Sequence, residues 1–394
     1  MAFSHLPAFL TSVFSALASR LHKSSAARLP LLLAGILFAR GRRTVTSWFR
    51  AAGISDDFRN GYTTVGAVGR EFDHMALSVQ RTVEPLLGPR RLLLGIDDSP
   101  TQRYGPCVEG AGIHHHPSPG PAGEKHLYGH IWVVLAALGK HPDWGTIALP
   151  VQAQLYIRQI DIARLPPERP RPFRTKLELA AAQLAWLKPW VDSDFEELWV
   201  AVDGGYAKKP FLRPAEATGW ETVECVQYGE KVSKTVKTFL ATWRPAGGVI
   251  RVVLVKEDDD WLPLFSIKAE ATAVEVVEAM ADRNALEQMN KDVKEVEGAG
   301  QQQVRNVHCN EGCFNMNLWM YTLVEAWAWN KEEEEVSDRS ASPWDSEPRR
   351  PSHADKRRAL QREILQAEIE AVLSGQPSQE DFRALAQRLL DLAA

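Results

Sequence analysis

The spacing of hydrophobic positions changes near residue 90. Upstream of it, Leu6, Leu10, Phe14 and Leu17 share one face of a first helix, and the apolar run over 29–38 predicts a second, buried helix. From residue 91 the pattern becomes short apolar runs of strand length: LLLGID, HLYGHIWVVLAALG, WGTIALPVQAQLYI and, after the helical spacing of LELAAAQLAWLKPWV, LWVAVD. We therefore predict an all-helical amino-terminal domain over 1–90 and an α/β core after it.

The predicted core, residues 91–330, contains an interruption. Between Asp203 and Glu287, the segments ETVECVQYG, KTVKTFLATWR and VIRVVLVKE are typical of strands separated by turns, which predicts a β-rich insertion at about 205–270. An apolar helix over 310–329 then closes the core. Residues 331–358 are charged and poor in apolar side chains, as in a linker, and 359–394 predict a tail of two amphipathic helices.

Composition narrows the class of protein. The chain has 394 residues, of which 45% are hydrophobic, enough for two or three globular domains. Four cysteines in this length indicate a reducing compartment, and no segment reaches the roughly 20 apolar residues of a membrane span, so we expect a cytoplasmic protein without membrane contact. The net charge of −4 means that a DNA partner would have to meet local basic patches.

Acidic residues follow two of the strand-like runs. Asp97 and Asp98 end the first run, and Asp203 ends LWVAVD. Residues 281–294 predict a helix that places Arg283, Glu287 and Lys294 on one face. Carboxylates from two strand ends and a later helix suit a pair of hard cations. The alternatives are a solvated helix face and aspartates that cap turns.

The order Asp, Asp, Glu, with the Glu inside Arg-x3-Glu-x6-Lys, resembles the DDE transposases of bacterial insertion sequences, in particular the group with the signature Tyr-x2-Arg-x3-Glu-x6-Lys. Two longer segments, IDDSPTQRYGPCVEGAGIHHHPSPGPAGEKHLYGH and GAGQQQVRNVHCNEGCFNMNLWMYTLVEAW, are similar to one branch of this group. The resemblance covers about residues 30–330. It implies a ribonuclease-H-like catalytic core carrying an inserted β-rich subdomain.

The resemblance also implies the roles of the site residues. Asp98, Asp203 and Glu287 would hold two Mg²⁺ (or Mn²⁺) ions, and Arg283 and Lys294 would contact phosphate. Asp98 is preferred to Asp97 because the family places its catalytic Asp directly before Ser or Thr, and Ser99 follows here. Only one of two neighbouring strand residues can face the metals.

The implied function is DNA transposition: metal-dependent cleavage at the element ends, then strand transfer into target DNA. Its partners would be double-stranded DNA and a second copy of the chain, since two ends must be brought together. The protein would act in the bacterial cytoplasm, in association with the nucleoid. Two alternatives stay open. One is a transposase-derived DNA-binding protein that is catalytically silent, and the other is a nuclease without strand transfer.

Arginines cluster in the amino-terminal region. Arg42, Arg43 and Arg50 surround a short helix that opens at Thr44, and this arrangement fits either a helix-turn-helix unit or an ordinary helical hairpin with an arginine edge. The amino-terminal helices of the resembled family often bind DNA, so we assign these three arginines to DNA contact.

Some positions depart from the family pattern. Met280 stands where the signature has Tyr, Asn284 where the branch has Trp, and Asn290 where an aromatic residue is common. These substitutions indicate either that this branch packs the helix differently or that the support around Glu287 is weakened in this chain. Two His and Cys clusters, His114 to His116 and the H-C-x3-C segment from His308, lack the companion ligands that a zinc site needs.

Overall fold

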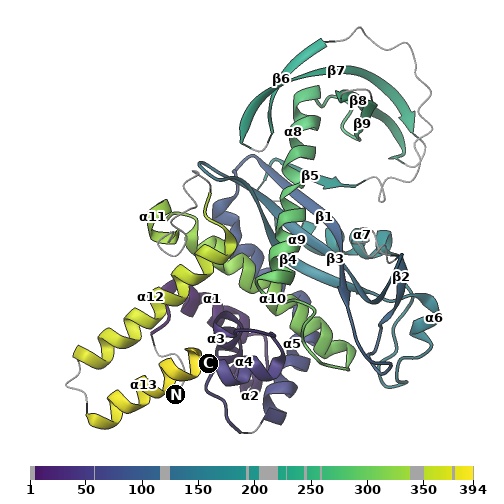
Figure 1. Cartoon of the computed structure of the whole chain (residues 1–394). Helices are drawn as coiled ribbons and strands as arrows, with labels where there is room; N and C mark the ends of the chain where they lie inside the picture. Colours follow the sequence, from purple (N-terminus) through teal and green to yellow (C-terminus); the bar gives the residue numbers. More distant parts are fainter. Residues whose placement is uncertain are drawn as a thin grey trace.

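The computed structural model describes residues 5–56, 58–115, 125–191, 195–203, 221–227, 229–243, 246–257, 260–337, 350–374 and 378–393. Predictions that fall on His116, on 204–220 and on 338–349 lie outside the described residues. Helices from both ends of the chain pack beside a mixed sheet, and a second sheet lies at the opposite end of the molecule (Figure 1).

The amino-terminal region is helical, as predicted. It comprises α1 (Ala8–Ala18), α2 (Lys23–Ala26), α3 (Leu29–Phe38), α4 (Val45–Ala51), α5 (Phe58–Val83) and the 3₁₀ turn η1 (Glu84–Leu86). Thr44 caps α4 by accepting a hydrogen bond from the Ser47 N–H. Trp48 and Phe49 of α4 are fully buried, so their helix is anchored in the core of this region.

The central sheet contains β1 (Arg91–Gln102), β2 (Gly112–His115), β3 (His126–His141), β4 (Gly145–Tyr156) and β5 (Glu197–Val202). β1 lies along one edge of β3, and β4 and β2 lie along the other; these pairings are antiparallel. β5 is parallel to β1 and follows the crossover through α6 (Gln159–Ile162) and α7 (Lys176–Val191). β1 therefore lies between an antiparallel and a parallel neighbour.

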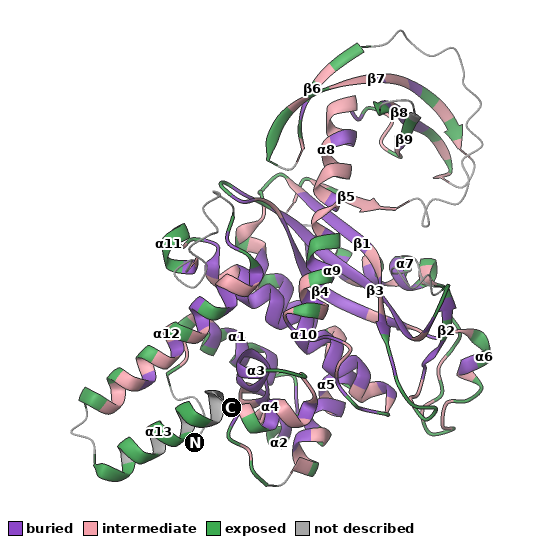
Figure 2. Ribbon diagram, viewed as in Figure 1, coloured by how far each residue is buried: buried purple, intermediate pink, exposed green. Residues whose placement is uncertain are grey.

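Much of β1 is buried (Figure 2), and its alternating residues build two separate cores, one on each face of the sheet. Leu92, Leu94 and Ile96 pack with the helix α7. Leu93 packs on the other face, with α9 (Ala285–Glu295) and α10 (Val307–Ala328). The same alternation decides which acidic residue of β1 meets which helix.

The predicted insertion forms a second, antiparallel sheet, ordered β6 (Glu221–Gln227), β7 (Glu230–Trp243), β8 (Gly248–Glu257) and β9 (Asp260–Ser266). α8 (Ala273–Arg283) packs on this sheet through Val276 and Val277. α9 continues from α8 and packs on the central sheet (Figure 1). The two helices thus connect the two sheets directly.

The carboxyl-terminal region comprises α11 (Glu333–Val336), α12 (His353–Ser374) and α13 (Gln379–Ala393). The tail is helical as expected, but α12 begins at His353, inside the segment predicted as linker. Its first turns are buried because His353, Lys356 and Arg357 form ion pairs with Glu297 and Glu325. These five residues are called the His353 cluster below. None of the described helices has the length and apolar composition that crossing a bilayer requires.

Candidate active site

Two acidic residues of neighbouring strands come together in the central sheet. In the parallel pairing of β1 with β5, Ile96 lies opposite Val202. The residues that follow them, Asp97 and Asp203, therefore lie side by side. Asp203 directly follows the end of β5, whereas Asp97 lies within β1, which continues to Gln102 and does not end at the acidic pair as the sequence predicted.

Gly95 allows the helix that carries Glu287 to approach these two aspartates. A Cβ at position 95 would lie 2.7 Å from Leu286 Cδ1, so α9 packs against the bare backbone of β1. The single helix predicted over 281–294 is divided at Asn284, whose N–H donates to the Ala281 carbonyl at 3.1 Å in a tighter, 3₁₀-type turn. Glu287 is in the first turn of α9.

Arg283 lies among the carboxylates, at the end of α8. Its Nη2 donates to Asp97 Oδ1 at 3.1 Å and lies 4.0 Å from Asp203 Oδ2, and its Nη1 lies 4.0 Å from Glu287 Oε1. The Arg283 side chain is 5% exposed, whereas those of Asp203 and Glu287 are 46% and 71% exposed. One buried cation therefore faces three acids, two of which are open to solvent.

Asn290, one turn after Glu287 in α9, is part of this arrangement. It is buried, and its Nδ2 donates to Asp97 Oδ2 at 3.2 Å. Asn290 and Arg283 thus hold one oxygen each of the Asp97 carboxylate. Burial raises the pKa of Asp97; Arg283 and the Asp98 N–H oppose this, and the neighbouring Asp203 charge adds to it. Arg283, Asp97, Asp203, Glu287 and Asn290 are called the Arg283 cluster below.

Asp98 faces the other side of the sheet. Its carboxylate forms an ion pair with Lys176 Nζ at the start of α7, and that ammonium also lies 5.9 Å from the centre of the Tyr156 ring. The geometry therefore departs from the sequence-based choice between the two neighbours. Asp97 has the side-chain direction that was expected of Asp98, because α9 covers the face of β1 to which Leu93, Gly95 and Asp97 belong.

Lys294 lies near the Arg283 cluster, at the far end of α9. Burial lowers the pKa of its ammonium, and the charges of Glu295 and Asp97 oppose that shift. The structure thus brings Arg283 and Glu287 together with Asp97, where Asp98 was expected, and places Lys294 within reach of the charge of Asp97.

The three amino-terminal arginines differ in exposure. Arg42 and Arg50 are exposed, whereas burial and the nearby Arg357 lower the pKa of Arg43 to about 10. The Arg43 N–H donates to Gln301 Oε1 at 2.8 Å, and its carbonyl accepts from Gln302 Nε2 at 2.9 Å. Arg43 thus joins the amino-terminal region to the loop after α9, while the other two present free surface.

The Arg283 cluster fits divalent cations in its donor chemistry. Carboxylate oxygens are the ligands that Mg²⁺ and Mn²⁺ prefer, and two of the three acids remain open to solvent. Within the described residues, no three His, Cys, Asp or Glu side chains are gathered closely enough to hold a metal ion. Here the guanidinium of Arg283 stands at the point where the acids converge.

Comparison with known proteins gives one family. Residues 14–240, more than half of the chain, match the family described as DDE superfamily endonuclease. The chain belongs to this family. The match includes the amino-terminal helices, β1 to β5 and the first part of the second sheet, and with them Asp97, Asp98 and Asp203.

Membership in the DDE superfamily endonucleases makes this a nuclease-type chain, and this family generally uses divalent metal ions. The match ends before Glu287, so the third acid is connected to the family by the geometry of the Arg283 cluster alone. A search of curated proteins gave no match.

Sequence reasoning did not place two residues that the structure brings into the Arg283 cluster. Asn290 was counted as a departure from the family pattern, although its amide donates to Asp97. Asp97 was set aside for its neighbour. Gly95 is the sequence signal for its position, because a glycine two residues before Asp97 marks the strand face that a helix approaches closely.

Proposed function

We propose that this DDE superfamily endonuclease is a DNA transposase, which cleaves phosphodiesters at element ends and joins the freed strand to target DNA. The observation that carries the proposal is the convergence of Asp97, Asp203 and Glu287 on Arg283 at one edge of the central sheet. The strand order and directions support a ribonuclease-H-like core: three antiparallel strands, a helix and a strand parallel to β1.

In this proposal Asp97, rather than Asp98, joins Asp203 and Glu287 as the ligands of two Mg²⁺ or Mn²⁺ ions. Such ions activate water and stabilise the leaving 3′-oxygen when bound. Arg283 and Asn290 fix the direction of the Asp97 carboxylate, and Lys294 supplies positive charge for a phosphate. Arg283 lies among the acids, and its guanidinium would be available to a phosphate if cations were bound to them.

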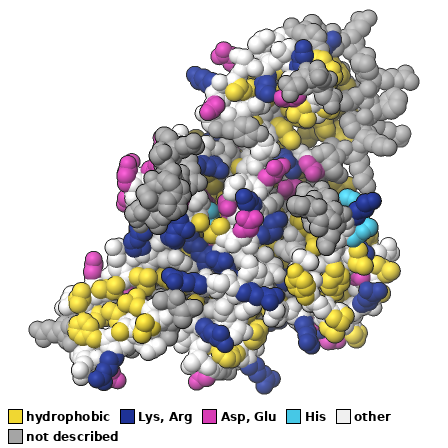
Figure 3. Space-filling view, in the orientation of Figure 1, with side chains coloured by type: hydrophobic (Ala, Val, Ile, Leu, Met, Phe, Trp, Pro, Cys, Tyr) yellow, Lys and Arg dark blue, Asp and Glu magenta, His cyan; other side chains and the backbone are white. Residues whose placement is uncertain are grey.

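The proposed partners are double-stranded DNA and a second copy of the chain. Arg42 and Arg50 are exposed and available for phosphate contact, and Figure 3 shows Lys and Arg side chains in a band across the middle of the molecule. This band is a local basic surface on a chain whose net charge is −4. Replacing both arginines with Ala should weaken DNA binding and reduce its salt dependence.

The decisive experiment uses a labelled duplex made from the DNA that flanks the coding sequence. We expect nicking that requires Mg²⁺ or Mn²⁺, followed by joining of the labelled 3′-end to a supercoiled target plasmid. Cleavage without joining would identify a nuclease. Binding without cleavage would favour the catalytically silent alternative, for which the position of Arg283 among the acids is the supporting observation.

A further inference from the structure

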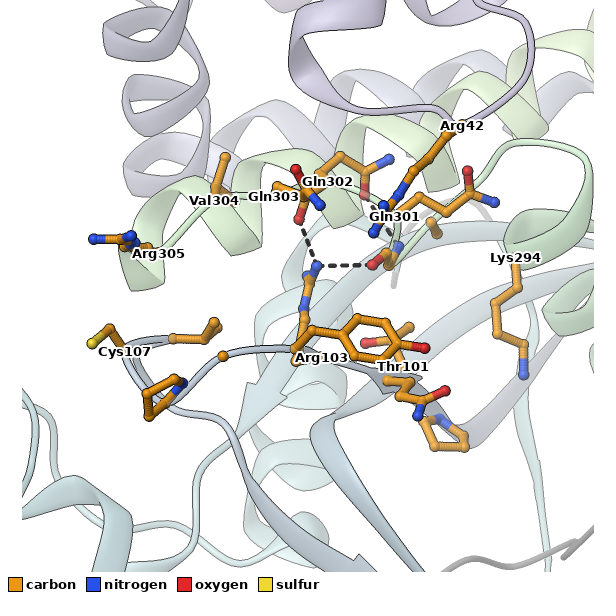
Figure 4. A pocket seen from close by; sticks show the side chains of 18 of the residues that line it. Arg42, Thr101, Arg103, Cys107, Lys294, Gln301, Gln302, Gln303, Val304 and Arg305 are labelled. Carbon is orange, nitrogen blue, oxygen red and sulfur yellow. Dashed lines mark hydrogen bonds between the residues drawn. The ribbon is translucent and has the colours of Figure 1, made fainter.

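A long groove begins beside the Arg283 cluster. It has a volume of about 1200 Å³ and lies between the end of β1, the loop after α9 and the turn at Gly41 and Arg42. Figure 4 shows Lys294 at one end, Arg103 in the middle and Arg305 with Cys107 at the other end. Lys294 is on α9, the helix that also carries Glu287 and Asn290, so this end of the groove is the one nearest the proposed site of cleavage.

The lining of the groove has one sign of charge. Its described lining residues include four cations, Arg42, Arg103, Lys294 and Arg305, and no Asp or Glu. Arg42 and Arg305 are exposed, so their guanidinium groups are accessible to a ligand. A continuous run of cations without carboxylates fits a chain of phosphates.

The floor of the groove is built around the buried Arg103. Its Nη1 donates to the carbonyls of Gly300 and Gln302 at 2.9 and 2.7 Å, and its Nε donates to His130 Nδ1 at 3.0 Å. The Arg103 side chain is 5% exposed, and its Nη2 has no hydrogen-bond partner among the described residues. Burial lowers the pKa of Arg103 to about 10, which still leaves it charged at neutral pH. The groove therefore contains a fixed cation with one donor group unused.

The walls offer groups that recognise bases. Tyr104 is 71% exposed, and an exposed ring beside cations is a stacking surface for a nucleobase. Gln301 and the exposed Gln303 bring amide groups to the same groove. In a duplex, bases are stacked and paired inside the helix, so a ring and amides at the level of the phosphates suit an unpaired strand.

We propose that this groove binds a segment of unpaired DNA strand that leads away from the scissile phosphate. The inference rests on the proposed function, since it assigns the groove to the same substrate. Arg42, Lys294 and Arg305 contact its phosphates, Tyr104 stacks on a base, and Gln303 donates to a base edge. Arg103 and Gln302 hold the floor and the loop in place, the latter by donating to the Gly298 carbonyl at 2.8 Å.

The test uses Cys107 as a reporter within the groove. Cys107 is the exposed one of the four cysteines, so its alkylation by iodoacetamide can be followed by mass spectrometry. The probes are a short oligothymidylate and a blunt duplex of equal length, without metal ions. We expect the oligothymidylate to slow alkylation several-fold and the duplex to have a much smaller effect.

Two variants sharpen the test. Tyr104→Ala should weaken oligothymidylate binding by roughly tenfold, and Arg305→Ala should reduce the slope of log affinity against log salt by about 0.7. The matched controls are Phe173→Ala, at another exposed aromatic residue, and Arg383→Ala, at an exposed arginine of α13. They should change neither the affinity for oligothymidylate nor its salt dependence. Equal protection by the duplex, or unchanged binding by Tyr104→Ala, would overturn the proposal. A protein that protects Cys107 but never cleaves DNA would contradict only the proposed function.

Discussion

The molecule contains two clusters of ionised side chains that differ in their exposure to solvent and in their balance of acidic and basic groups. In the His353 cluster every member is buried, and His353 donates to Glu325 Oε1 at 2.7 Å and to Glu297 Oε1 at 2.9 Å. Two carboxylates there meet three basic groups. In the Arg283 cluster three carboxylates meet one guanidinium, and two of them are open to solvent.

The comparison distinguishes ion pairs that stabilise the fold from charged groups that are exposed to a ligand. The His353 cluster joins α12 to the end of α10 and to the loop after α9, and Arg357 also donates to the carbonyl of Leu37 in α3. All five of its side chains take part in ion pairs within the protein. The Arg283 cluster gathers three carboxylates around one guanidinium and leaves two of them exposed to solvent, where cations can reach them. Four changes test this distinction.

The largest expected effect is on catalysis. Asp97→Asn keeps the size of the side chain but removes its charge, and should reduce metal-dependent cleavage by more than the roughly 10–100-fold that loss of an outer partner costs. Asp98→Asn is the matched control, because that carboxylate pairs with Lys176 on the opposite face. Rates of duplex nicking measure both. A larger fall in the nicking rate for Asp98→Asn than for Asp97→Asn would indicate that Asp98 is the catalytic residue.

The second effect is on stability. Lys356 and Glu325 are both 3% exposed and joined at 2.6 Å, so Lys356→Met leaves a buried carboxylate with less compensation. The free energy of unfolding, measured with urea, should fall by about 3–5 kcal/mol. Lys331→Met is the control, since Lys331 pairs with Glu363 near the surface and should lose about 1 kcal/mol or less. Equal losses of unfolding free energy in the two variants would mean that burial does not make the ion pairs of this cluster more important than a surface pair.

The third effect concerns the support of Asp97. Asn290→Ala removes one of the two side-chain donors to that carboxylate, and cleavage should fall by about 10–100-fold while DNA binding is retained. Asn290→Phe, which restores the aromatic residue expected at this position, should be no better, because a ring cannot donate to Asp97. Gln288→Ala, at an exposed position of the same helix, serves as the control. Higher cleavage by Asn290→Phe would show that the amide has no role.

The smallest effect is a pH dependence of stability. Burial alone would lower the pKa of His353, but its hydrogen bonds to Glu297 and Glu325 raise it above the usual value. A raised pKa contributes stability that is complete below the unfolded value of about 6.5 and is lost as pH rises through the folded value. Melting temperatures of the wild type should therefore fall above about pH 6.5 more steeply than those of His353→Gln. Parallel curves would exclude His353 as the titrating group.

Much of the fold could be predicted from local pattern. The apolar run of α3, the cap at Thr44 and most strands of the two sheets are confirmed because periodicity and turn chemistry act within a few residues; β2 and β9 were not predicted. The choice between Asp97 and Asp98 depended on which helix covers which face of β1, and that is a long-range contact. The buried start of α12 was missed for the same reason: its charged residues look solvated until Glu297 and Glu325 are placed beside them.

The division at Asn284 places Glu287 at the junction between the two sheets. α8 packs on the second sheet through Val276 and Val277, and α9 packs on the central sheet through Leu286. Glu287 lies just past the junction of these two helices. The distance between Glu287 and Asp97 therefore depends on how the second sheet is positioned relative to the central sheet.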